Sequence, residues 1–288
     1  IKRLKKNVYV TNFENDLPCI ELYPNMNNKL SEWENEKKKI AYKIKEITLV
    51  WRISYEDRCF LLNRGIKTWD NIYLLNNLYD LKDNNIKNIQ EQIIHINTQN
   101  DILINPRKNI SQKFKDILKI HENEFIFDIE SLINLEEKTS YFDNIIKKDH
   151  PHICIIGNIY LKDNNFNYFK DFTINKLDID EEKNIILNWI QNLNNKNLDV
   201  IYLYHWGHAE KTYIDYIKKK YPEIVFPNII LIDLLSYFKN EPIIIKDAFN
   251  FSLKTIGKCL YKYKFIDTTW SETDNGMDAM IKFKEISL

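Results

Sequence analysis

The order of the apolar segments after residue 120 constrains the fold more than any other feature of the chain. Three apolar runs of strand length come first, at 124–131, 152–161 and 167–174. Beyond them, further apolar runs alternate with segments whose apolar residues recur every three or four positions, which is the period of a helix. The pattern predicts a helix over 180–195 capped by Asp180, a strand over 199–206, a helix over 209–223, a strand or helix over 229–238, and helices over 252–261 and 277–286.

Three strands in succession followed by this alternation is the element order of a ribonuclease H-like fold. The 199–206 segment, DVIYLYHW, is apolar almost throughout, as expected for a strand that is buried on both faces of a sheet. We therefore expect an α/β domain over residues 121–288, in which helices flank a mixed five-stranded sheet.

Residues 1–120 are predicted to form an α-helical N-terminal region. The apolar residues of 33–51 recur at helical spacing, and Ser31 precedes them with a Glu three positions later, which is the pattern of a capping box. A second helical stretch over 55–75 has a glycine in its middle, which predicts a helix, a tight turn and another helix. Residues 80–112 are rich in Asn, Lys and Asp, and we expect them to be a linker.

The charge balance and the cysteines limit the classes of protein to which the chain can belong. The 41 basic side chains equal the 41 acidic ones, so a nucleic-acid partner has to be argued from a site and not from a global basic excess. No run approaches about 18 consecutive apolar residues, so no membrane-spanning helix and no membrane partner are expected. The four cysteines include no C-x-x-C pair, which favours free thiols in a reducing, intracellular compartment, either cytoplasm or nucleus.

The ends and the residue usage of the chain lead to two further expectations. The sequence begins IKRLKKNVYV, without Met and without the apolar core of a signal peptide, so we expect a piece of a longer protein. Ile and Asn are unusually frequent, which fits an AT-rich genome such as that of a virus or a parasite.

Two acids in an apolar strand are the main chemical signal in the sequence. Asp128 and Glu130 are two positions apart, so their side chains are expected to project from the same face. Neighbouring carboxylates in an apolar setting are unfavourable unless a proton or a cation lies between them, and Mg²⁺ or Mn²⁺ prefers such oxygen ligands. Glu210 and Asp278 each begin a predicted helix, and in a ribonuclease H-like sheet all four acids converge on one metal pair. The alternative interpretation is a strand end whose acids face solvent.

Short motifs around these acids resemble those of the DEDD exonuclease superfamily. FDIES is similar to the first exonuclease motif, with Asp128 and Glu130 as its acids, and NGMDA is similar to the third, with Asp278 as its final Asp. YHWGHAE resembles the second motif in its His and in the acid at its end. In this chain Trp206 stands where that motif usually has Asn, and Glu210 stands where it usually has Asp.

The resemblance extends to one branch of that superfamily, the ribonuclease H-like domain of predicted RecB-family nucleases. FSLKTIGKCL, which contains Lys254, resembles a helix of this branch, and the segments Trp33–Trp51 and Arg58–Asp70 resemble the connector that precedes its domain. The resemblance implies an upstream RecB-like nuclease module in the full-length chain, of which residues 1–120 would be the tail.

The resemblance also implies an activity, a metal-dependent 3′–5′ exonuclease that hydrolyses phosphodiester bonds in DNA or RNA, with a single-stranded end as its substrate. Two Mg²⁺ or Mn²⁺ ions would be held by the four acids, with Asp128 bridging both. His205, Trp206 and Lys254 would contact the substrate, whereas the alternative for the His and the Trp is packing at a strand-to-helix turn. His208, close by, is expected to pack or to form a hydrogen bond.

One departure from the family pattern leaves alternatives open. The superfamily usually has a general base, a His five residues or a Tyr four residues before the final Asp, and here those positions are Thr273 and Asp274. The main alternative is therefore a catalytically weak or inactive ribonuclease H-like module that binds nucleic acid or protein. A ribonuclease H-type endonuclease, which uses a similar set of acids, is the third interpretation.

Overall fold

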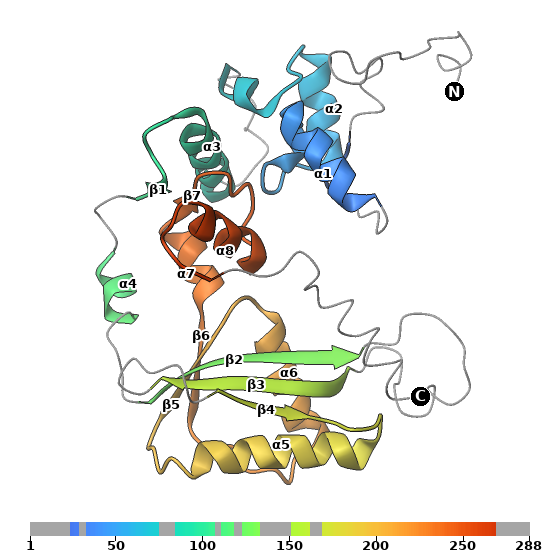
Figure 1. The fold of residues 1–288 in the computed structure, drawn as a ribbon, viewed down its shortest axis with the longest axis vertical. Helices are drawn as coiled ribbons and strands as arrows, with labels where there is room; N and C mark the ends of the chain where they lie inside the picture. The colour runs from blue at the N-terminus through green and yellow to red at the C-terminus, as the bar shows by residue number, and fades with distance from the viewer. Residues whose placement is uncertain are drawn as a thin grey trace, which may run out of the picture. The chain divides into compact units, whose positions relative to one another are not determined.

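The structure is a computed structural model of the 288-residue chain. It describes residues 24–28, 33–74, 84–106, 111–117, 123–132, 151–161 and 169–268 (Figure 1). The chain forms two compact units, each assembled from two segments. Unit 1 consists of Ile1–Arg107 and Ile244–Asp267, and unit 2 consists of Lys108–Ile243 and Thr268–Leu288. The segment Ile244–Asp267 thus groups with the N-terminal residues, although the sequence assigns it to the 121–288 domain.

Unit 2 contains the mixed five-stranded sheet that the sequence predicts, with the strand order β4-β3-β2-β5-β6. Its strands are β2 (Glu124–Leu132), β3 (His152–Leu161), β4 (Phe169–Thr173), β5 (Ile201–His205) and β6 (Ile229–Asp233). Strand β2 is central: it pairs antiparallel with β3 on one side and parallel with β5 on the other. Strand β4 extends the antiparallel side and β6 the parallel side.

The helices of unit 2 follow the alternation that the sequence predicts. They are α4 (Gln112–Ile117), α5 (Ile179–Asn194), α6 (Ala209–Lys220) and α7 (Leu234–Asn240). Helix α5 begins one residue earlier than expected, because the carboxylate of Asp178, and not that of Asp180, accepts from the free backbone N–H groups of its first turn. The ambiguous 229–238 segment is both a strand and a helix, since it divides into β6 and α7 at Asp233.

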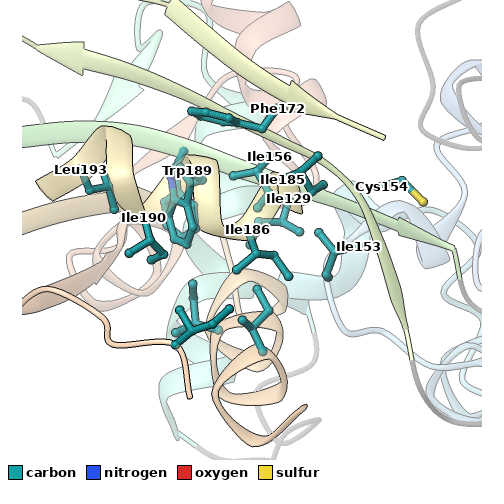
Figure 2. Packing of buried hydrophobic residues seen from close by; sticks show 14 of the residues in the cluster. Ile129, Ile153, Cys154, Ile156, Phe172, Ile185, Ile186, Trp189, Ile190 and Leu193 are labelled. Carbon is teal, nitrogen blue, oxygen red and sulfur yellow. The ribbon is translucent and has the colours of Figure 1, made fainter. Parts of the chain in front are cut away.

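The core of unit 2 lies between the sheet and helices α5 and α6. On α5, Trp189 and Leu193 are fully buried and Ile190 nearly so, and Ile129 of β2 belongs to the same cluster (Figure 2). Phe127 of β2 is also part of this cluster. Full burial of one such side chain stabilises the fold by roughly 1.5–3 kcal/mol relative to its exposed state. This packing fixes the side of β2 that faces the core, and so the side from which its polar residues project.

A buried polar cluster joins β3, α5 and α6 within this core. Glu182 of α5 accepts hydrogen bonds from the Ile153 backbone N–H at 2.9 Å and from the Tyr221 hydroxyl at 2.8 Å, and it pairs with Lys220. The Nδ1 atom of His152 lies 3.5 Å from the same carboxylate, and the imidazole is fully buried, with no hydrogen bond at either ring nitrogen.

Unit 1 is mainly helical, as the sequence predicts for its N-terminal part. It contains α1 (Glu34–Lys43), α2 (Tyr55–Asn63), α3 (Asn84–Thr98), α8 (Leu253–Lys262), and the short 3-10 helices η2 (Ile47–Leu49) and η3 (Trp69–Leu74). Strands β1 (Ile104–Asn105) and β7 (Ile244–Ile245) pair antiparallel. The central glycine of the second helical stretch, Gly65, has φ +80° and forms the predicted turn between α2 and η3.

The helix expected over 33–51 is shorter than predicted, and Trp33, one of the apolar residues that predicted it, is exposed. Helix α1 ends at Lys43, after which Lys45 adopts a positive φ of 55° and the chain enters η2. The helix ends locally, because the backbone N–H of Glu46 donates to the Ala41 carbonyl at 2.8 Å across this turn. The buried carboxylate of Glu46 then lies 3.0 Å from the Arg58 guanidinium. Trp33 is 67% exposed and is not a core residue. The expected cap Ser31 lies outside the described residues.

The expected linker over 80–112 is a second departure from the sequence prediction. Helix α3 occupies 84–98 and buries Ile89, Ile93 and Ile96. Its Gln90 side chain donates to the backbone carbonyl of Trp51 at 2.8 Å, so the helix is an integral part of unit 1.

Among the helices that the structure describes, none is long and apolar enough to cross a membrane.

Candidate active site

The central strand β2 presents the first two acids that the sequence singles out. Its pairing with β3 is regular as far as Glu130 and shifts only between Glu130 and Ser131. Phe127 and Ile129 are buried, whereas Asp128 is exposed and Glu130 half-buried, so the two acids lie on the face opposite to these core residues. The shared face that the sequence predicts for Asp128 and Glu130 is therefore present in the fold.

Glu210 reaches the same end of the sheet through the turn that follows β5. Strand β5 runs parallel to β2, with Tyr204 opposite Ile126, so the carboxyl ends of both strands meet at one edge. The chain then turns at Gly207, whose φ of +110° favours glycine, and α6 begins at Ala209. Glu210 lies in the first turn of α6 and is 7% exposed.

The carboxylates of Asp128 and Glu210 interact with each other. The pKa of Asp128 is raised above its ordinary value, first by the protein around it, which reduces its hydration, and then by the negative charge of Glu210 and a hydrogen bond with that side chain. A second carboxylate raises a pKa in this way because the two like charges resist simultaneous ionisation. A shared proton or a bound cation would relieve this repulsion.

His205, at the end of β5, lies beside the carboxylate of Glu210. Its Nδ1 atom lies 3.4 Å from Oε2 of Glu210, and both atoms are buried without a hydrogen-bond partner. The imidazole is 4% exposed, and its ring packs edge-on against Phe127 with 5.8 Å between ring centroids. A ring buried to this degree offers almost no surface to a substrate.

Two tyrosines fix the strands and helix that carry the site. The Ser131 hydroxyl donates to the Tyr213 hydroxyl at 2.9 Å, which connects the end of β2 to α6. The Tyr204 hydroxyl donates to Glu124 at 2.6 Å, which connects β5 to the start of β2. Burial, and then the Glu124 carboxylate, raise the pKa of Tyr204 well above its ordinary value, so the phenol keeps its proton and remains a donor.

Asp233 is a site-supporting residue that sequence reasoning missed. Its carboxylate accepts from the backbone N–H of Gly207 at 2.9 Å and from those of Leu235 and Ser236, which begin α7, at 3.0 and 3.4 Å. One side chain therefore holds both the turn before Glu210 and the start of α7. The available signal was an Asp between an apolar strand and a helical segment, which is a typical N-cap.

The remaining predicted site residues have different environments. The Trp206 ring packs at 4.9 Å, edge-to-face, against Phe238 of α7, which agrees with the alternative that it is a packing residue. His208 is exposed and precedes α6, with no capping hydrogen bond from its side chain. Lys254 lies on α8 in unit 1, and its phosphate contact stays a prediction. Asp278, with Thr273 and Asp274 before it, lies outside the described residues.

The chemistry of this site suits a hard divalent cation. Asp128 and Glu210 supply neighbouring carboxylate oxygens, and Glu130 lies on the same face of β2 as Asp128. Within the described ranges, no group of three or more His, Cys, Asp and Glu side chains is arranged to hold a metal ion.

Comparison of the chain with known protein families, with curated proteins and with solved structures finds no match.

Proposed function

We propose that this chain contains a ribonuclease H-like domain that acts as a metal-dependent nuclease, with the character of a 3′–5′ exonuclease on DNA or RNA. One observation carries the proposal. The carboxylate of Asp128 on the central strand interacts with that of Glu210 at the start of the helix after the neighbouring parallel strand. The strand order β4-β3-β2-β5-β6, with a change from antiparallel to parallel pairing at β2, supports the same assignment.

The proposed roles of the side chains follow from their chemistry. Asp128 and Glu210, together with Glu130 and Asp278, would hold Mg²⁺ or Mn²⁺. Bound ions of this kind supply a hydroxide nucleophile and neutralise the charge on a scissile phosphate. The protein side chains hold the carboxylates in place, and Tyr204 and Tyr213 fix the elements that carry them.

A hydrolysis assay on labelled strands tests this proposal. The protein is incubated with 5′-labelled single-stranded DNA or RNA and Mn²⁺, and the wild type is compared with Asp128→Asn. Asp171→Asn is the matched control, because Asp171 is an exposed acid on the outer strand β4 of the same sheet. We expect a ladder that shortens from the 3′ end with the wild type and the control. The Asp128 variant should lose more than the roughly 10- to 100-fold that loss of an outer-shell partner costs.

Two outcomes of this assay would contradict the proposal. No shortening by the wild type, or equal shortening by the wild type and Asp128→Asn, would exclude the nuclease activity. Cuts inside a circular substrate would instead favour the ribonuclease H-type endonuclease.

The second candidate function is an inactive module of the same fold that binds nucleic acid or a partner protein. It is favoured by Thr273 and Asp274, which occupy the positions of the usual general base. Binding of a labelled strand without hydrolysis, unaffected by Asp128→Asn, would support this candidate. In either case we place the protein inside the cell, because the cysteines of the described residues, Cys59, Cys154 and Cys259, are free thiols.

A further inference from the structure

The contact between His205 and Glu210 is unusual for two buried polar groups. The Nδ1 and Oε2 atoms are 3.4 Å apart, and neither has a hydrogen-bond partner. A buried polar atom without a partner costs roughly 1–3 kcal/mol, so a structure that buries two of them face to face is expected to pair them. A small movement of either side chain closes the distance to that of an ordinary hydrogen bond.

The imidazole is the fixed member of this pair. The backbone of His205 is opposite Asp233 in the ladder between β5 and β6, and its ring is held by the edge-on contact with Phe127. Glu210, by contrast, has a flexible side chain in the first turn of α6, and the negative charge of Asp128 repels its carboxylate. The carboxylate is therefore the group whose position has to be set.

When Glu210 is ionised, only one state of the ring makes this contact favourable. A carboxylate oxygen accepts but does not donate when it is ionised, and an imidazole nitrogen without hydrogen is also an acceptor. Nδ1 must then carry a hydrogen and donate it to Oε2. In proteins whose metal ligands are carboxylates, such outer partners orient the ligand and raise metal affinity.

We propose that His205 is a positioning residue for Glu210, and not a substrate contact: its Nδ1–H donates to Oε2 and holds the carboxylate where it meets Asp128 and a divalent cation. The proposal rests on the cation-dependent function proposed above. A nearly fully buried His would thus orient the Glu210 carboxylate toward the cation. The proposal also predicts that Glu210 determines which ring nitrogen of His205 carries the hydrogen.

The affinity for Mn²⁺, measured by electron paramagnetic resonance of the free ion, gives the first test. In His205→Asn the amide nitrogen stands close to the place of Nδ1, in His205→Gln it stands close to the place of Nε2, and His205→Leu has no donor. We expect Asn to retain the Mn²⁺ affinity within about threefold, and Gln and Leu to lose about 10- to 100-fold. Equal affinity in the Leu variant and the wild type would overturn the proposal, as would an equal loss in all three variants with unchanged thermal stability.

The second test uses the metal-free protein and is independent of nuclease activity. Nitrogen-15 spectra of the imidazoles at pH 8 show whether Nδ1 of His205 carries a hydrogen, with His205→Asn identifying the signal. We expect a protonated Nδ1 whose resonance shifts in Glu210→Gln. It should not shift in Glu223→Gln, which alters an exposed acid paired with Lys183.

The outcomes separate the two proposals. An unprotonated Nδ1, or a resonance that Glu210→Gln leaves unchanged, would overturn the role of His205 whatever the protein does to nucleic acids. If instead the wild type binds Mn²⁺ through Asp128 but hydrolyses no strand, the nuclease proposal fails, and the Nδ1 resonance still decides the role of His205.

Discussion

At the scale of single residues, the pair Asp128 and Glu210 shows how a site is built at the expense of stability. An acid whose pKa is higher in the folded than in the unfolded chain binds its proton more tightly when folded. The stabilising contribution of Asp128 to the metal-free fold is then fully present below the ordinary pKa of Asp, and it is lost as pH rises through the raised pKa of Asp128. Natural sites often retain such unfavourable pairs because function requires them.

We therefore expect Asp128→Asn to stabilise the metal-free protein at neutral pH, because it removes one charge of the repelling pair. The gain should be larger at pH 7 than at pH 4, because the raised pKa of Asp128 leaves a larger fraction of this carboxyl protonated at the lower pH. Chemical denaturation of both proteins at the two pH values measures the difference. A variant that is less stable than the wild type at pH 7 would show that the pair is not strained.

His152 leads to a prediction of the opposite sign. Burial lowers the pKa of this imidazole below its ordinary value, although the Glu182 charge acts against the shift. The unfolded chain thus takes up a proton more readily, so stability is present above about pH 6.5 and is lost as pH falls through the lowered pKa. In His152→Phe, the free energy of unfolding should change less between pH 6.5 and 4.5 than in the wild type. His208→Gln, at an exposed position, is the control and should leave the slope unchanged.

At the scale of elements, the turn between β5 and α6 is held by one side chain, that of Asp233. Asp233 accepts from the N–H groups of both Gly207 and the first turn of α7, so its loss leaves donors of two elements unpaired. Because Glu210 follows this turn by three residues, the stability of the turn and the position of the carboxylate are connected.

Asp233→Ala should lower the free energy of unfolding by about 1–2 kcal/mol, the usual cost of removing an N-cap, and should weaken Mn²⁺ binding as Glu210 loses its support. Asp233→Asn keeps the acceptor oxygen and serves as the matched variant, with a smaller loss in both measurements. If the Ala variant is destabilised but binds Mn²⁺ as the wild type does, the turn does not position Glu210.

The strands of unit 2 could be predicted from the sequence because each is a short apolar run with clear ends. The run at 152–161 coincides with β3, and those at 124–131 and 199–206 differ from β2 and β5 by only one or two residues at an end. The sequence singles out Asp128 and Glu210 for the same reason, since Asp128 lies in the middle of such a run and Glu210 lies shortly after one. The burial of His205 could not be predicted, because it depends on Phe127 from another strand.

The elements of unit 1 were harder to predict because distant partners determine them. Glu46, which precedes η2, is buried in an ion pair with Arg58 of α2, twelve positions away. In α3 the frequent Asn residues obscured the helical spacing of Ile89, Ile93 and Ile96, whose burial stabilises the helix. Local propensity is a weak guide where packing makes the decision.

At the scale of the whole molecule, the division into two compact units implies two unfolding transitions. Each unit has its own buried residues, such as Ile245 and Ile96 in unit 1 and Ile186 and Ile153 in unit 2. Units with separate cores generally unfold as separate cooperative blocks.

Ile245→Ala should destabilise unit 1 by about 2–5 kcal/mol, the usual cost of truncating a buried Ile, and should shift only one of two transitions in a denaturant titration. Ile186→Ala, in unit 2, should shift the other transition and reduce Mn²⁺ binding at partly denaturing conditions. A single transition that both variants move equally would show that the units unfold together.

The path of the chain through these units has a consequence for how the protein is made. Strand β1 of unit 1 has its partner β7 in the segment Ile244–Asp267, which the ribosome produces only after all the described strands and helices of unit 2. Unit 1 therefore cannot be completed until the intervening segment of about 140 residues has been synthesised, at the usual 5–20 residues per second. During that interval the faces of α3 and its neighbours that are buried in unit 1 lack the cover that Ile244–Asp267 supplies, although these helices are synthesised before unit 2.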